Sequence, residues 1–287
     1  GVVKHAYAAG GSRGLRVKSA LNGVWLGHPL HPAVTDIPLG AWTTAVALDA
    51  AGAATGRDEF SACAKAATAV GVAGAVAAAV AGVTDWSDTD GRARRVGFVH
   101  GALNVAATGL FAASFVMRRR KQPGRGRACA LLGYVVALGA AYLGGDLVYG
   151  EQTGVNHAAG QEVPEDFTPV LALNELGERQ PRRVTVGTTA VLLVRYGNTV
   201  RAMADTCSHL GGPLSEGTLK DGGIVCPWHG SCFALDDGHV VNGPATHPQP
   251  CFETRVRGGQ IEIRMPRSPE SASLAEEEGA TGSRAVS

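Results

Sequence analysis

Four long, almost uncharged runs constrain the fold of the first half of the chain. Three contain no Asp, Glu, Lys or Arg, and the fourth contains only Asp49; they are Ile37–Thr55, Ala66–Thr84, Val96–Met117 and Ala128–Gly145. Each run is close to the ~20 residues that a helix needs to cross the hydrocarbon core of a bilayer. A helix on the surface of a soluble protein would carry a polar stripe at helical period, and these runs carry none. We therefore predict four transmembrane helices that pack through Gly and Ala.

The composition restricts the class of protein further. Charged residues make up 18% of the chain and hydrophobic residues 45%, which excludes a disordered protein. The 26 basic and 25 acidic side chains nearly cancel, so the chain lacks the basic surface of a nucleic-acid-binding protein and we expect no nucleic-acid partner. The alternative to a membrane domain is a soluble bundle of buried, Ala-rich helices, because Ala favours membrane insertion only weakly.

The first 33 residues differ from the runs that follow. Residues 1–33 are basic and Gly-rich and lack the apolar core of a secretory signal peptide. We interpret them as an N-terminal basic segment before a four-helix transmembrane domain at residues 34–149. Basic residues gather on both sides of the predicted helices, so the positive-inside rule leaves the membrane orientation open. The expected location is the cell membrane, as a multi-pass protein.

The second half has a different pattern. A polar linker at residues 150–167 precedes short β-type runs, and two pairs of these runs flank the hairpin loops Gly197–Asn198 and Gly258–Gly259. The pattern predicts an all-β domain at residues 168–266, followed by a disordered tail at residues 267–287. The predicted fold class is therefore multi-domain, with an all-α four-helix transmembrane bundle followed by an all-β domain.

The β half contains one pattern of metal-ligand residues. Cys207-x-His209 is separated by sixteen residues from Cys226-x-x-His229, so each of two loops offers one thiolate and one imidazole. Two such loops can surround a compact inorganic centre. Two cysteines and two histidines are also a zinc ligand set, although zinc fingers normally keep both cysteines in one knuckle.

This pattern and its surroundings resemble the Rieske family over residues 168–266. Gly211–Gly212–Pro213 follows the first ligand pair, and Gly243–Pro244–Ala245 matches the proline loop of that family. The resemblance implies a [2Fe–2S] cluster as the cofactor. In such a cluster Cys207 and Cys226 would hold the buried iron, and His209 and His229 would hold the outer iron.

The resemblance also implies roles for residues beside the cluster. Ser231 matches a hydrogen-bond donor to cluster sulfur, and Phe233 stands where high-potential members have a donor tyrosine. Gly212 and Trp228 occupy the positions of the disulfide cysteines in those members. Hydrogen bonds to sulfur raise the reduction potential, so we expect a value in the lower or middle part of the Rieske span of about −150 to +300 mV. This chain is thus more similar to the ferredoxin-like branch.

Histidine and aspartate side chains gather at one end of the predicted helices. The run G-H-P-L-H-P at positions 27–32 resembles the opening of a bacterial family of four-helix membrane domains of uncharacterised function, over about residues 25–157. An up-and-down bundle would place these side chains at one membrane face: His28, His31, Asp85, His100, Asp146 and His157. We consider three interpretations: ordinary interfacial polar residues, a b-type haem held by His31 or His28 with His100, or a site for a quinone headgroup.

Together these patterns predict a membrane-anchored Rieske protein that carries single electrons. Its partner would be a redox protein or a quinone, and its setting a lipid bilayer. About twenty residues follow the cluster domain, where Rieske oxygenases carry a catalytic domain. We therefore expect an electron-transfer component of an oxidoreductase system rather than a stand-alone enzyme. The alternative is a non-enzymatic redox sensor or assembly module that uses the cluster.

Overall fold

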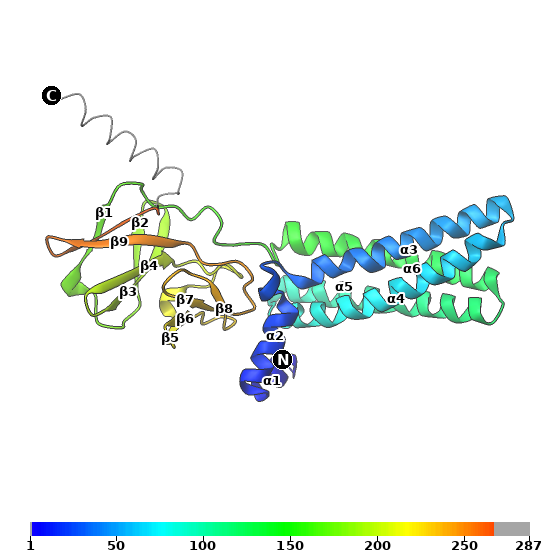
Figure 1. Cartoon of the computed structure of the whole chain (residues 1–287), viewed down its shortest axis with the longest axis horizontal. Coiled ribbons are helices and arrows are strands. Elements are labelled where there is room, and N and C mark those ends of the chain that lie inside the picture. Colours follow the sequence, from blue (N-terminus) through cyan, green and yellow to red (C-terminus); the bar gives the residue numbers. More distant parts are fainter. Residues whose placement is uncertain (1, 267–287) are drawn as a thin grey trace, which may run out of the picture. The chain divides into compact units, whose positions relative to one another are not determined.

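The chain folds into two compact units. A computed structural model describes residues 2–266, and the predicted disordered tail lies outside the described residues. The helical unit comprises the residues up to 155 together with 242–246, and the β unit comprises most residues from 156 onward. Figure 1 shows the helices of the first unit and the strands of the second.

The helical unit consists of two short helices followed by four long ones. The helices are α1 (Val2–Ala9), α2 (Gly11–Asn22), α3 (Leu30–Thr55), α4 (Asp58–Trp86), α5 (Gly91–Arg119) and α6 (Pro123–Gly145), with a 3-10 turn, η1 (Val24–Leu26), and a π turn, η2 (Asp146–Gly150). α3 packs chiefly on α4, and α5 packs chiefly on α6. The predicted bundle of four long helices is confirmed, and α1 and α2 are additional to it.

Polar contacts with the end of α4 and the residues after it hold α1 and α2. The Lys18 ammonium donates to Asp88 Oδ1 at 2.9 Å, and the Asn22 amide donates to Asp85 Oδ1 at 2.7 Å. The Tyr7 hydroxyl lies 2.8 Å from the Thr84 hydroxyl. Burying Lys18 and Asp88 is favourable only because the two charges are paired. Neither helix was predicted within the basic segment, because partners about 70 residues apart leave no local pattern.

Three of the four long helices have the length and hydropathy of membrane spans. They are α4, α5 and the segment of residues 123–150, and the search covered the described residues. α3 is of similar length, at 26 residues, but it carries His31, Asp36 and Asp49 and falls outside this set. Large apolar side chains face outward from the bundle, among them Val105 at 70% exposure and Tyr142 at 79%. An apolar exterior of this kind suits contact with lipid.

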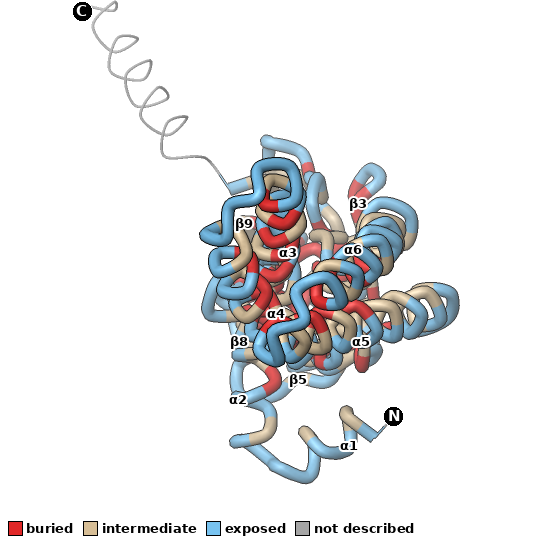
Figure 2. The backbone as a smooth tube through the Cα atoms, turned by 90° about the vertical axis from the view of Figure 1, so that its right-hand side faces the viewer, coloured by how far each residue is buried: buried red, intermediate tan, exposed pale blue. Residues whose placement is uncertain are grey.

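Small residues and one aromatic pair fill the interior of the bundle. Ala64, Ala107 and Ala140 have no exposed surface, and Figure 2 shows buried positions along the inner sides of α3–α6. The Trp42 ring of α3 stacks on the Phe111 ring of α5, with centroids 4.2 Å apart and planes 7° from parallel. Close helix packing through small residues matches the prediction from composition.

The buried positions show that the bundle consists of two similar helical hairpins, α3–α4 and α5–α6. Four of the five buried positions of α3 have a buried counterpart 69 residues later in α5, in the pairs Pro38 and Ala107, Trp42 and Phe111, Ala45 and Ser114, and Asp49 and Arg118. Buried positions of α4 recur 62 residues later in α6, in the pairs Ala64 and Gly126, Thr68 and Ala130, Gly71 and Gly133, and Ala78 and Ala140. The side chains differ at most of these pairs, so the repeat is one of buried position rather than of residue identity.

One of these pairs is a buried ion pair. The Arg118 guanidinium donates to both carboxylate oxygens of Asp49, at 2.8 Å for Oδ1, and each residue is 8% exposed. Arg118 Nε also donates to the Ser114 hydroxyl at 3.1 Å, and Arg127 Nε lies 3.8 Å from Asp49 Oδ1. Bidentate geometry and these additional partners offset part of the cost of removing two charges from water.

The β unit contains two antiparallel sheets. A six-stranded sheet has the order β1 (Thr168–Ala172), β10 (Gln260–Arg264), β9 (Cys251–Arg257), β4 (Thr199–Ala204), β3 (Thr189–Tyr196) and β2 (Arg182–Val186). A four-stranded sheet has the order β5 (Thr218–Lys220), β6 (Gly223–Val225), β7 (Cys232–Ala234) and β8 (Val240–Asn242). Two 3-10 turns complete the unit, η3 (Leu173–Glu175) and η4 (Leu214–Glu216).

The two predicted hairpins are confirmed. β3 and β4 pair across Gly197–Asn198, and β9 and β10 pair across Gly258–Gly259. The core beneath the six-stranded sheet contains Leu193, Ile261 and Ile263, each without exposed surface. This core supports β4, from which the first of the two Cys/His loops emerges.

Removing one partner of the buried ion pair should destabilise the helical unit. We expect Asp49→Leu to lower the free energy of unfolding by about 3–5 kcal/mol, because Arg118 would remain buried without a counter-charge. The double variant Asp49→Leu/Arg118→Met should recover most of that loss. Thermal unfolding in detergent, followed by circular dichroism, measures both effects.

The exposed ion pair Arg57–Glu59 provides the control. Its side chains are 64% and 72% exposed, so Glu59→Ala should change the stability by less than about 1 kcal/mol. A double variant as unstable as Asp49→Leu would contradict the interpretation, since it would show that the pair itself, rather than the unpaired charge, determines stability.

Candidate metal centre

Two loops of the β unit carry the Cys/His pattern. The first loop follows β4 and begins at Cys207, and the second connects β6 to β7 and begins at Cys226. In each loop the cysteine carbonyl accepts a hydrogen bond from the N–H of a glycine four residues later, Gly211 at 2.9 Å and Gly230 at 3.1 Å. In each loop the cysteine N–H donates to the carbonyl five residues later, at 2.8 Å. The two loops therefore share one backbone design.

A left-handed glycine closes each loop. Gly211 has φ +76° and Gly230 has φ +80°, a conformation in which other residues are strained. This turn lies one residue after His229 in the second loop and two residues after His209 in the first. It explains why glycine follows both ligand pairs in the sequence.

The two thiols form a buried, hydrogen-bonded pair. Cys207 is 1% exposed and Cys226 is 3% exposed. The hydrogen bond from Cys207, aided by backbone N–H groups of Trp228 and His229, lowers the pKa of the Cys226 thiol to about 7. The same hydrogen bond and burial raise the pKa of Cys207, against the N–H groups of its own loop. Backbone N–H groups of both loops thus lie ready to stabilise negative charge on these sulfurs.

The two imidazoles lie nearer the surface than the thiols. His209 and His229 are half-buried, with ring centroids 5.1 Å apart and planes at 82°. Within residues 2–266, no three His, Cys, Asp or Glu side chains converge on one point that could hold a metal ion. The four donors instead form two pairs, one of sulfur and one of nitrogen. This division suits two irons with two protein ligands each, as in the cluster implied by the sequence.

The residues predicted to lie beside the cluster differ in exposure. Ser231 and Phe233 are fully buried, while Trp228 is 55% exposed. A Cβ at Gly212 would lie 2.9 Å from Cys226 Sγ and 2.9 Å from the Trp228 ring. The two positions that resemble disulfide cysteines in high-potential relatives are therefore adjacent in space, and here they hold a glycine and an indole.

Gln249, a buried residue that was not predicted to belong to the site, holds the first loop in place through hydrogen bonds. Gln249 is 2% exposed; its side-chain amide donates to the carbonyls of Ala204 and Thr206 at 2.8 and 2.6 Å, and its Oε1 accepts from the Ser208 N–H at 3.1 Å. One side chain thereby satisfies three backbone groups on both sides of Asp205. A glutamine lacks ligand chemistry, so no motif distinguishes it; only its full burial does.

The structure separates the histidines and aspartates predicted at the helical end. His31 and His100 lie together, with ring centroids 6.2 Å apart. His28 instead contacts the Pro29 carbonyl at 3.0 Å. Asp85 binds the Asn22 amide, and Asp146 lies 3.6 Å from Arg92.

His157 groups with the β unit, and its place at the helical end stays a prediction. Its backbone N–H donates to the carbonyl of Ser208, in the first ligand loop, at 3.0 Å. The chain has already left the helical unit at this residue, because η2 ends at Gly150.

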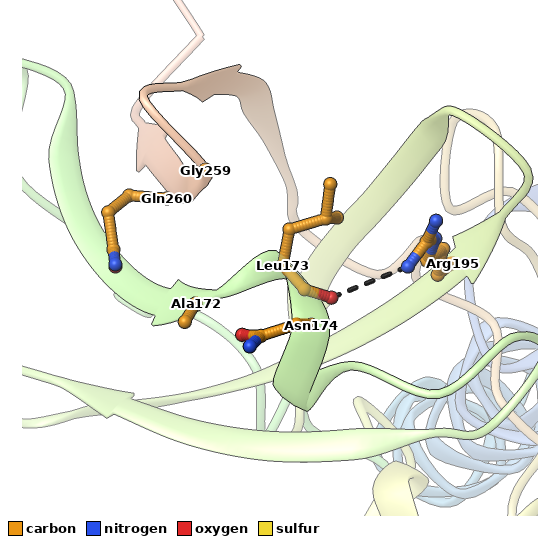
Figure 3. A pocket seen from close by; sticks show the side chains of 6 residues that line it. All are labelled: Ala172, Leu173, Asn174, Arg195, Gly259 and Gln260. Carbon is orange, nitrogen blue, oxygen red and sulfur yellow. Dashed lines mark hydrogen bonds between the residues drawn. The ribbon is translucent and has the colours of Figure 1, made fainter.

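A pocket of about 520 Å³ lies elsewhere in the β unit. It is formed by η3 and the turns of the six-stranded sheet, and Figure 3 shows Arg195 directed toward the Leu173 carbonyl at its edge. None of the four Cys/His ligand candidates lines it. The pocket is therefore distinct from the metal centre.

Comparison with known families divides the chain in the same way as the structure. Residues 166–253 match the Rieske [2Fe-2S] domain, and residues 27–157 match a family described as predicted membrane protein (DUF2231). The description of this second family assigns no activity to it.

Comparison with individual proteins concerns the β unit. The anthranilate 1,2-dioxygenase ferredoxin subunit of Burkholderia cepacia is 31% identical over 100 residues, which are 35% of this chain and 93% of that protein. Apoptosis-inducing factor 3 of Mus musculus is 33% identical over 95 residues, which are 33% of this chain and only 16% of that protein. The ferredoxin of carbazole 1,9a-dioxygenase from Nocardioides aromaticivorans IC177 is a solved structure with 26% identity and a TM-score of 0.34, covering 35% of this chain and 98% of that one.

The similarity to a complete ferredoxin subunit determines the family. It also decides between the two cofactors open at the sequence level, because the Rieske domain binds a [2Fe–2S] cluster and not zinc. The chain therefore belongs to the Rieske [2Fe–2S] family, and it carries its cluster domain after a helical domain that matches predicted membrane proteins.

Proposed function

We propose that this protein is a membrane-anchored electron carrier whose Rieske cluster exchanges single electrons with a redox partner. The cluster would be held by Cys207 and Cys226 on the inner side and by His209 and His229 on the outer side. When bound, it supplies reversible one-electron oxidation and reduction. The observation that carries the proposal is the paired arrangement, with buried thiols beside half-buried imidazoles.

The residues of the chain give the two sides of the site different tasks. The buried thiols and the N–H groups directed at them would exclude water and stabilise negative charge on sulfur. The half-buried imidazoles give the site an edge within reach of a partner, next to the exposed Trp228. Such an edge suits transfer between proteins rather than conversion of a bound substrate.

The relatives suggest the class of partner. One similar protein is the ferredoxin subunit of anthranilate 1,2-dioxygenase, which supports a redox protein as the partner of this cluster. A quinone is the second candidate, because the helical unit would place the chain in a lipid bilayer. We expect the chain to act as one component of an oxidoreductase system.

The membrane half of the proposal rests on the three apolar spans and the apolar exterior of the bundle. We expect the full chain to remain in the membrane fraction after alkaline carbonate washing and to require detergent for release. Recovery of folded, cluster-containing protein in the wash would contradict the proposed anchor. Protease treatment of right-side-out vesicles then assigns the side of the β unit.

Substitution of any proposed ligand should abolish the cluster. We expect Cys207→Ser, Cys226→Ser, His209→Ala and His229→Ala each to reduce iron and acid-labile sulfide from two per chain to near zero, because every ligand is needed to close the site. Electron paramagnetic resonance of the reduced full-length protein should lose the Rieske signal.

Cys251→Ser is the matched control for the thiol substitutions. Cys251 is a half-buried thiol of the same unit, donates to the Gln249 carbonyl at 3.6 Å, and lies outside the ligand pattern. It should keep full iron and sulfide content. A cluster that survives Cys207→Ser would overturn the ligand assignment.

The proposed hydrogen bond from Ser231 predicts a change in potential. Ser231→Ala should lower the midpoint potential by about 40–65 mV, because one hydrogen bond of about 1–1.5 kcal/mol stabilises the reduced cluster and a one-electron potential changes by about 59 mV per 1.4 kcal/mol. A redox titration of the cluster signal measures the change. The exposed Thr199→Val removes a hydroxyl from the β3–β4 hairpin and should leave the potential unchanged; equal shifts in both variants would contradict the role of Ser231.

A further inference from the structure

The histidine pair of the helical unit is part of the repeated design of that unit. His31 of α3 and His100 of α5 are 69 residues apart, the same spacing that relates Trp42 to Phe111. α3 and α5 both begin at the same end of the bundle (Figure 1), and the two imidazoles meet there. Unlike Trp42 and Phe111, or Asp49 and Arg118, the two members of this pair are the same residue.

Both rings are anchored in the same way. His31 Nδ1 lies 2.8 Å from the Ala78 carbonyl of α4, and His100 Nδ1 lies 2.8 Å from the Ala140 carbonyl of α6. Ala78 and Ala140 are themselves equivalent positions of the repeat. A carbonyl only accepts, so each Nδ1 carries the proton and each Nε2 presents a lone pair. Histidines that bind metals commonly have their second nitrogen fixed in this way.

Glycines make room for both rings at equivalent positions of the two hairpins. A Cβ at Gly82 would lie 2.8 Å from the His31 ring, and a Cβ at Gly144 would lie 3.1 Å from the His100 ring. Gly82 and Gly144 each lie four residues after the alanine that accepts the hydrogen bond. The helices α4 and α6 are thus shaped around the two imidazoles.

The distance between the rings fits one metal ion between them. The centroids are 6.2 Å apart and the planes are at 89°. Metal–imidazole bonds are about 2.0–2.1 Å long, and a ring nitrogen lies about 1.2 Å from the ring centroid. Two imidazoles on opposite sides of one metal therefore have centroids about 6.4 Å apart. Within the described residues Nε2 of His31 forms no hydrogen bond, and Nε2 of His100 lies 3.1 Å from the Asn104 amide. That amide also donates to the His100 carbonyl at 3.0 Å, so it keeps a partner when Nε2 binds a metal.

The number of donors identifies the kind of metal. Protein sites for single ions such as zinc use three or four side chains, and no third His, Cys, Asp or Glu joins this pair within residues 2–266. A metal that brings its own equatorial ligands needs only two axial nitrogens from the protein, which is the requirement of haem iron. Two lone pairs suit this Lewis acid and do not suit a quinone carbonyl, which needs a hydrogen-bond donor.

We propose that His31 and His100 are the two axial ligands of a b-type haem in the helical unit. The site would give the chain a second one-electron centre, at the end of the bundle where η2 begins the passage to the β unit. Haem binding is independent of the cluster and does not rest on the function proposed above.

Purified full-length protein in detergent, prepared with added haem precursor and titrated with haemin, tests the proposal. We expect one haem per chain, with a sharp Soret band and a low-spin ferric signal in electron paramagnetic resonance. His31→Gln and His100→Gln should each weaken haem binding at least about tenfold, because each removes an iron–nitrogen bond. His28→Gln is the matched control and should bind haem as the unchanged protein does, since its ring contacts the Pro29 carbonyl instead.

Further measurements separate loss of a ligand from loss of folding. His100→Met should retain haem with an altered spectrum, because a thioether can replace one axial imidazole. Elution from a sizing column and cluster content should stay unchanged in all variants, and Cys207→Ser should lose the cluster while keeping the haem. Folded protein that binds no haemin, ligand variants that bind it normally, or a co-purified quinone without haem would each overturn the proposal.

Discussion

The β unit depends on the burial of two adjacent thiols. Sulfur that must become negatively charged is costly to remove from water unless hydrogen bonds and positive charge replace the solvent. Both ligand loops meet this need with the same backbone path, in which N–H groups turn toward the cysteine and a left-handed glycine returns the chain to the sheet. Gln249 then holds the first loop, and β6 and β7 of the four-stranded sheet flank the second. Because each histidine follows a buried cysteine by only two or three residues, the imidazoles lie half-buried on the outer side of the thiols.

In the helical unit, too, buried polar groups need partners within the protein. Its interior is too closely packed for bulky side chains, and small residues occupy most of it. Three pairs of larger or polar side chains join the two hairpins in this interior: an aromatic stack, an ion pair and a pair of imidazoles. A polar atom in a region without water must find its partner within the protein. Asp49 and Arg118 are such partners for each other, and His31 and His100 each find one in a backbone carbonyl.

The sequence predicted the features that are encoded locally. The uncharged runs identified the long helices, and Gly197–Asn198 and Gly258–Gly259 identified two hairpins, because each pattern lies within one short segment. The Cys/His spacing identified the cluster domain for the same reason. Features that join distant segments were missed: the contacts of α2 with α4, the brace at Gln249, and the twofold repeat. The repeat could not be recognised in the sequence, because the two hairpins share their buried positions but carry different residues at most of them, as at Trp42 and Phe111.

The divergence of Asp49 and Arg118 has a consequence for how this bundle could assemble. These residues are equivalent in the two hairpins, yet they carry opposite charges and face each other in the interior. Two copies of the first hairpin would bring two carboxylates together, and two copies of the second would bring two guanidiniums together. Neither half can therefore serve as its own partner, and only the combination of both hairpins pairs a carboxylate with a guanidinium at these positions. The covalent connection between α4 and α5 provides this combination within every copy of the chain.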